Sequence, residues 1–65
     1  MCLSTVYTYC EDPTETEEIC SSISSYEVDG SSIIFTDLLG DEYAVEGTVT
    51  KVDFVKSKIF VAVAG

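Results

Sequence analysis

Three cysteines are the most chemically versatile side chains of this 65-residue sequence, because the sequence contains no histidine. Without an imidazole there is no Ser-His-Asp or Cys-His catalytic arrangement, and no side chain suited to acid–base work near neutral pH. The glycine-rich phosphate-binding motifs GxGxxG and GxxxxGKS/T are also missing. These absences predict that the protein is not an enzyme, and they direct attention to metal binding by thiolates.

Cys2 occupies the one position where a thiol and an α-amine can belong to the same residue. Because this second residue is small, we expect Met1 to be removed, which leaves Cys2 with a free α-amine. The amine (pKa about 8) and the thiol (pKa about 8.5) can then close a five-membered chelate ring. The deprotonated backbone amide of Leu3 can add a further nitrogen. Nitrogen and thiolate donors arranged in a plane suit Ni(II) or Cu(II) better than Zn(II). The alternative to metal binding is that Cys2 is an ordinary residue at the start of a strand.

The other two cysteines have weaker interpretations, because positions 2, 10 and 20 match no CxxC or zinc-knuckle spacing. Cys20 lies in an apolar segment and is interpreted as a small buried hydrophobe. Cys10 follows a predicted strand and is either a rim residue or an auxiliary metal ligand. One chain offers few strong donors, so a two-fold homodimer that joins two Cys2 residues would complete a site. Such a dimer would also stabilise a chain this short.

The charge of the chain is strongly negative, with 12 acidic residues against three lysines and a net charge of −9. Only Lys51, Lys56 and Lys58 could neutralise phosphates, so nucleic acid is not an expected partner. The nearby Phe54 and Phe60 are expected in the core rather than as stacking platforms. No secretory signal or membrane span is recognisable, and an odd number of cysteines fits a reducing compartment. We therefore expect a cytoplasmic protein without membrane contact.

Alternating apolar residues and turn residues predict five short strands. Their expected ranges are 1–9, 19–30, 32–38, 43–54 and 58–63, with an exposed acidic loop at 11–18. Residues 14–24 are ambiguous: Ile19, Ile23 and Tyr26 have helical spacing, but the serine-rich segment around them disfavours a helix. We favour a strand that is bent or bulged between Ile23 and Tyr26.

A second change of apolar phase lies near Gly47, where a glycine indicates a bulge or a sharp bend. Five short, bent strands predict a small antiparallel β-barrel that comprises the whole chain, residues 1–65, as a single domain. Closure requires the first strand to pair with a late one. The amino terminus is therefore expected against the barrel wall.

Three segments of the sequence, MCLSTVY, VDGSSIIFTDLLGDE and VEGTVTKVDFVKSKI, resemble the small CooT-like proteins in order and spacing. The resemblance implies an SH3-like five-stranded barrel, a homodimer, and Ni(II) bound through the amino-terminal cysteine. It also links the nickel to maturation of the carbon monoxide dehydrogenase active site. Only Cys2 matches a ligand position, and Cu(II) or Zn(II) remain alternatives in vitro. The same family has also been described as predicted RNA-binding proteins.

Two functions follow from these observations. The first is a nickel-binding accessory protein, a chaperone or store for a client nickel enzyme, with the metal held across a homodimer. The alternative is a small barrel that acts as an interaction adaptor or RNA-binding module without metal. Loss of nickel binding in Cys2→Ser would separate them.

Overall fold

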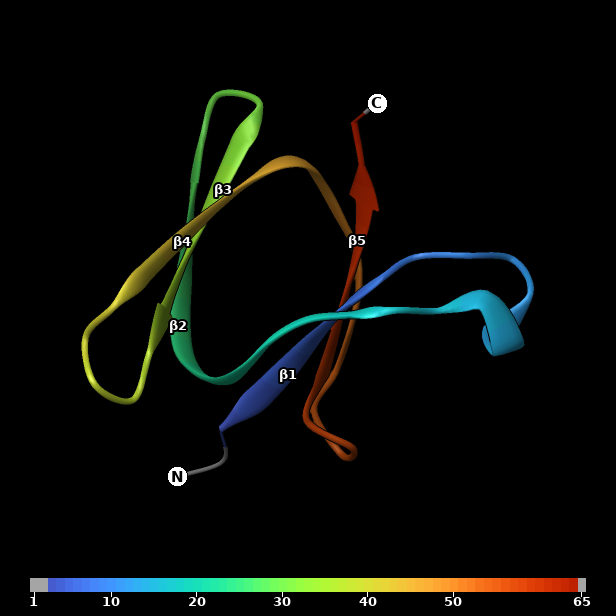
Figure 1. Cartoon of the computed structure of the whole chain (residues 1–65), viewed down its shortest axis with the longest axis horizontal. Coiled ribbons are helices and arrows are strands. Elements are labelled where there is room, and N and C mark those ends of the chain that lie inside the picture. Colours follow the sequence, from blue (N-terminus) through green and yellow to red (C-terminus); the bar gives the residue numbers. More distant parts are fainter. Residues whose placement is uncertain (1–2, 65) are drawn as a thin grey trace.

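Five strands form a closed barrel in a computed structural model that describes residues 3–64 (Figure 1). Each strand pairs with the next in the chain, and the first also pairs with the last. The elements are β1 (Ser4–Thr8), the 3-10 helix η1 (Pro13–Glu15), β2 (Glu18–Asp29), β3 (Ser32–Asp37), β4 (Glu42–Asp53) and β5 (Lys58–Val63). The predicted all-β, five-stranded fold is confirmed. No helix in the described part of the chain is long and apolar enough to cross a membrane.

The barrel closes through a parallel pair, whereas its four other strand pairs are antiparallel. In this pair Val6 of β1 lies opposite Ile59 of β5. The reason is the odd number of strands: when directions alternate around a ring of five, the first and fifth must run the same way. The first strand therefore pairs with a late one, as predicted, and both strands start at the same end of the barrel.

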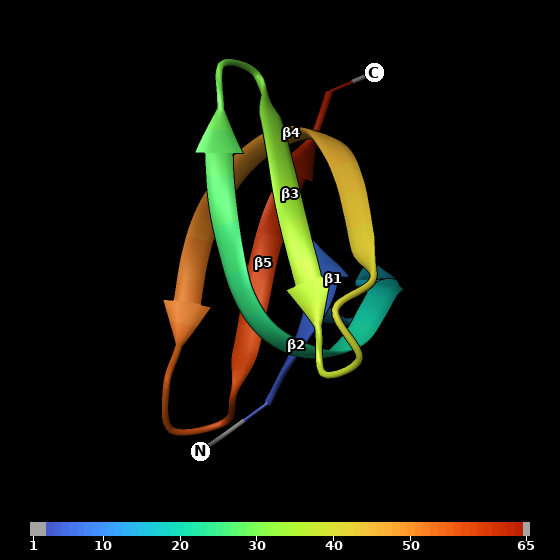
Figure 2. The ribbon, with the colours of Figure 1, turned by 90° about the vertical axis from the view of Figure 1, so that its left-hand side faces the viewer.

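The ambiguous segment is part of β2 and not a helix. One half of β2 pairs with β1 and the other half pairs with β3, with a register shift between Ile23 and Ser25. Ser22 has a positive φ of 58°, which marks the bend. Figure 2 shows β2 curving beneath the barrel to join the two neighbours. The preference for a bent strand over a helix is confirmed.

Strand β4 is also strongly curved, as Figure 2 shows, but its register shift lies between Val49 and Lys51 and not at Gly47. Gly47 pairs with Val63, and an added Cβ would clash with the carbonyl oxygen of Ala62. The glycine thus permits a close approach of two backbones, and the bulge comes three residues later.

The hydrophobic core is small, because a chain of this length buries only about 60% of its unfolded surface. It contains one side chain or more from every strand except β4, and the half-buried Val45, Val49 and Val52 of β4 pack against it. Its fully buried members are Val6, Ile23, Ile33, Phe35, Ile59 and Val61.

Asp37 is a buried carboxylate at the end of β3, and it organises the turn to β4. It accepts hydrogen bonds from the Leu39 N–H at 2.9 Å, the Asp41 N–H at 3.0 Å and the Tyr43 hydroxyl at 2.8 Å. The bond from Tyr43 is the largest cause that lowers the pKa of Asp37, while burial opposes it. The charged carboxylate is therefore part of the folded structure.

We expect Asp37→Asn to lower the midpoint of urea unfolding at about pH 7, since an amide cannot accept all three bonds as well. Because the folded-state pKa is lowered, the contribution of Asp37 is present above the ordinary aspartate pKa of about 4 and is lost as pH falls further. The difference in urea midpoint between wild type and variant should therefore become smaller below about pH 4. Tyr43→Phe, which removes one bond, should show a smaller gap with the same trend. A gap that does not change with pH would contradict this role.

Candidate metal terminus and adjoining groove

The start of β1 lies beside the turn that joins β4 and β5. The Thr5 N–H donates to the Ser57 carbonyl at 3.0 Å, and Ser4 lies opposite Ile23 of β2. Leu3, the first described residue, is half-buried and precedes β1. Cys2, the predicted metal ligand, falls outside the described residues. The predicted position of the terminus against the barrel wall agrees with the contacts of Ser4 and Thr5.

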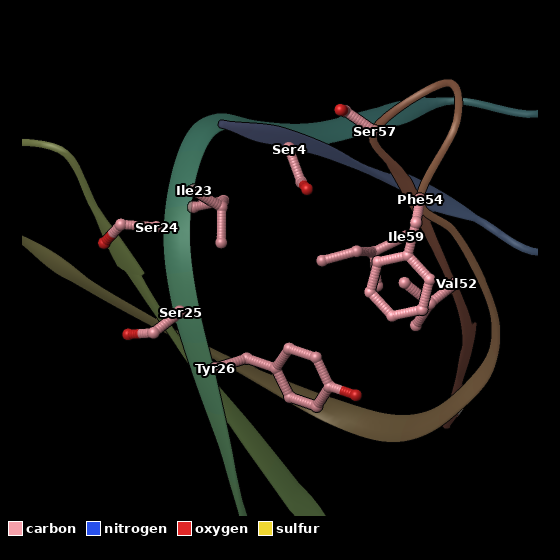
Figure 3. A pocket seen from close by; sticks show the side chains of 9 residues that line it. All are labelled: Ser4, Ile23, Ser24, Ser25, Tyr26, Val52, Phe54, Ser57 and Ile59. Carbon is pink, nitrogen blue, oxygen red and sulfur yellow. The ribbon is translucent and has the colours of Figure 1, made fainter. Parts of the chain in front are cut away.

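An apolar groove of about 380 Å³ opens at this end of the barrel, and we call it the terminal groove. Figure 3 shows the ring of Tyr26 on one side, facing Phe54, Val52 and Ile59 on the other. The groove is lined by Ser4, Ile23, Ser24, Ser25, Tyr26, Val52, Phe54, Ser57 and Ile59. Ser4, two residues from Cys2, is therefore part of its wall.

None of the described residues that line the terminal groove is charged, although the chain has a net charge of −9. Its apolar rim is exposed: 85% of Phe54 and 96% of the adjoining Val55 are accessible to solvent. Both residues belong to a turn held by the Asp53 carboxylate, which accepts from the Val55 and Lys56 N–H groups at 3.0 Å each. An exposed, uncharged apolar surface of this kind is typical of an interaction site.

Phe54 and Phe60 were expected in the core, and the structure shows that both predictions were wrong. Phe60 is half-buried and stacks on Tyr7, outside the core. Phe54 is exposed. Strand β4, which was expected to include Phe54, ends at Asp53. Phe54 therefore belongs to the following turn, where the strand alternation that buries every second side chain no longer applies. The groove itself was not predicted. The only sequence signal for it was two consecutive apolar residues, Phe54 and Val55, at the end of a strand.

Among residues 3–64, no three histidine, cysteine or acidic side chains converge to hold a metal ion. Cys10 follows the opposite end of β1, where its Sγ donates to Glu15 Oε2 at 3.6 Å. The structure therefore does not bring Cys10 to Leu3 within one chain.

Cys20 lies on β2 opposite Val6 and packs against the core as a free, half-buried thiol. Burial is the main cause that raises the pKa of the Cys20 thiol, and the charges of Glu18 and Asp37 add to it. A raised pKa leaves less thiolate at neutral pH, so Cys20 is poorly suited to metal binding or redox chemistry.

These features define a small closed β-barrel with an apolar groove beside the start of β1. A family model described as CO dehydrogenase accessory protein CooT matches residues 1–62. The chain therefore belongs to the CooT family.

The fold is shared with a solved structure that is provisionally assigned as CooT from Carboxydothermus hydrogenoformans. The two chains superpose with a TM-score of 0.82 over 98% of this chain and 100% of the other, at 8% sequence identity. At that identity the likeness concerns the fold alone. A search of curated proteins finds no match.

We expect iodoacetamide to alkylate Cys20 several-fold more slowly than free cysteine at about pH 8, because the thiolate fraction and the accessibility are both reduced. Peptide mass mapping against time measures the rate at each cysteine separately. The same measurement in urea is the control, since unfolding should remove the difference. Equal rates for folded and unfolded Cys20 would contradict its assignment as a packed thiol.

Proposed function

We propose that this protein binds Ni(II) at its mature amino terminus and serves as a chaperone or store for a nickel enzyme. The observation that carries the proposal is the family match, which starts at residue 1 and therefore includes Cys2. The family description, CO dehydrogenase accessory protein, makes CO dehydrogenase the first client to test. We assign the protein an accessory role rather than a catalytic one, in the reducing cytoplasm.

The α-amine and thiolate of Cys2, with the Leu3 amide, would supply the donors. Such a set has the nitrogen and sulfur character that Ni(II) accepts, and each donor must lose a proton to bind. The affinity should therefore rise with pH across the range where the amine and the thiol titrate, at about pH 8 to 8.5. The described chain adds no cluster of three candidate ligands, which supports a site completed by a second terminus.

We further propose that the second terminus comes from another copy of this chain, docked through the terminal groove. A two-fold axis that passes between two Cys2 residues must bring their immediate surroundings into contact, because both partners use the same surface. The surroundings are the groove residues next to Ser4, with Phe54 as an exposed apolar anchor. Because no charged side chain lines the groove, this contact would not press carboxylates of two chains of charge −9 together.

Substitution of Cys2 by Ser should abolish tight nickel binding, because a hydroxyl does not provide a thiolate donor. Addition of one glycine before Cys2 should have a comparable effect, since it moves the α-amine away from the thiol while leaving the thiol in place. Calorimetry and the thiolate-to-nickel charge-transfer absorption measure both variants, with mass spectrometry to verify removal of Met1.

Cys10→Ser is the matched control and should bind nickel as the wild type does. Unchanged nickel affinity in Cys2→Ser would overturn the metal site and leave the metal-free adaptor as the function to pursue.

Phe54→Asp should convert the dimer to monomer, because it places two carboxylates in an apolar contact near the two-fold axis. Leu39→Asp is the matched control: Leu39 is 83% exposed on the β3–β4 turn and does not line the groove. Sedimentation velocity, with and without Ni(II), measures the oligomeric state. A dimer that survives Phe54→Asp, or one that Leu39→Asp disrupts equally, would place the interface elsewhere.

A further inference from the structure

The three lysines are gathered around one outer face of the barrel, and none of them lines the terminal groove. Lys58 and Phe60 alternate with the buried Ile59 on β5, so their side chains share the outer face. Tyr7 of β1 and Lys51 of β4 lie opposite Phe60 on either side. Together with Tyr9 and Lys56, these residues form what we call the lysine face: Tyr7, Tyr9, Lys51, Lys56, Lys58 and Phe60.

Aromatic rings and ammonium groups are in direct contact on this face. The rings of Tyr7 and Phe60 are stacked, with centroids 5.8 Å apart and an interplanar angle of 27°. The Lys58 Nζ lies 5.4 Å from the centroid of Tyr7, and the Lys51 Nζ lies 5.9 Å from that of Phe60. Both distances fall within the range of cation–π attraction. The two half-buried rings therefore hold two ammonium groups close to an aromatic pair.

Two hollows flank Phe60, with volumes of about 260 and 340 Å³. Lys58 and Tyr7 line the first, and Lys51, Lys56 and Tyr9 line the second. Neither hollow shares a residue with the terminal groove. Carboxylates also border this face. Glu18 of β2 lies opposite Tyr7, and Asp53 at the end of β4 accepts from two backbone N–H groups of the following turn.

We propose that the lysine face binds a free nucleoside phosphate. The chemistry is complementary in two respects: ammonium groups attract phosphates, and a nucleobase stacks on aromatic rings such as those of Tyr9 and Phe60. This arrangement needs no glycine-rich loop. It is independent of nickel binding, since it uses neither Cys2 nor the terminal groove.

A small ligand fits this face better than a nucleic-acid strand. Pro13 and Thr16, which line the hollows, belong to the segment 11–18 with its five carboxylates. A strand long enough to pass over the face would also meet these carboxylates, and each further phosphate would be repelled. A mononucleotide can place its phosphates near the lysines alone.

The test is a titration of the full chain with ADP at low ionic strength, followed by amide chemical shifts in NMR spectra. Saturable shifts should concentrate at Tyr7, Lys51, Lys58 and Phe60. Adenosine alone and pyrophosphate alone should each bind at least tenfold more weakly than ADP, since each supplies one half of the complementary chemistry. Binding should weaken with added salt.

Variants separate the two halves of the site. Lys51→Gln with Lys58→Gln should weaken ADP binding at least tenfold, and Phe60→Leu should weaken ADP by about fivefold but leave pyrophosphate unchanged. The matched control combines the two lysine substitutions with Glu27→Gln and Glu42→Gln. These two carboxylates are exposed on β2 and β4, and their removal restores the net charge of the wild type. This control should bind ADP as weakly as the double variant does. Recovery of ADP affinity would show that the lysines act only through net charge and would overturn the proposed site.

Three other results would also overturn the proposal. They are the absence of saturable shifts up to millimolar ADP, shifts confined to the terminal groove, and a single-stranded oligoadenylate that binds more tightly than ADP at the same salt concentration. Circular dichroism of each variant verifies that the barrel is folded, so that a loss of binding can be assigned to the face.

Discussion

Closure of the barrel by a parallel β1–β5 pair is the constraint on which the rest of the structure depends. Because five strands alternate in direction around the ring, β1 and β5 must start at the same end. The turn before β5 therefore lies beside the start of β1, and the Thr5–Ser57 backbone hydrogen bond joins the two. For this reason the start of β1 and the β4–β5 turn together line the apolar groove, although more than fifty residues separate Thr5 from Ser57.

Two bulged strands make so tight a closure possible. Strands β2 and β4 are each 12 residues long, and each bends so that its two halves belong to two different sides of the barrel. The bends cost hydrogen bonds in the ladders, and Thr50 compensates in part by donating its hydroxyl to the Phe60 carbonyl at 3.0 Å. Each bulge also shifts the alternation by one residue, which decides whether the following side chains face the core or solvent.

The surface has three chemically distinct regions as a result. The terminal groove is apolar and uncharged, the lysine face is basic and aromatic, and the segment 11–18 is acidic. In a chain of net charge −9, self-association is easiest where no carboxylate is brought close to another. The proposed dimer contact and the proposed anion site therefore use different surfaces of one small barrel.

Much of the fold was predictable because its signals are local. Period-two alternation and turn residues located all five strands to within a few residues, except at the amino terminus, and the serine-rich sequence argued correctly against a helix in β2. The metal site was predicted from the chemistry of Cys2 and from a family resemblance that the family match supports; its ligands remain a prediction, because Cys2 lies outside the described residues.

The sequence by itself determined the strand composition, the negative charge and the identity of the candidate terminal donors. Only the tertiary structure decided that Phe54 is exposed, that Tyr7 joins the lysines, and that Cys10 lies away from the terminus. These outcomes depend on which strands become neighbours and in which register. Ring closure and the bulges in β2 and β4 set that register. A change of apolar phase within β2 indicated its bend, but no pattern within a single strand specifies which residues become cross-strand partners.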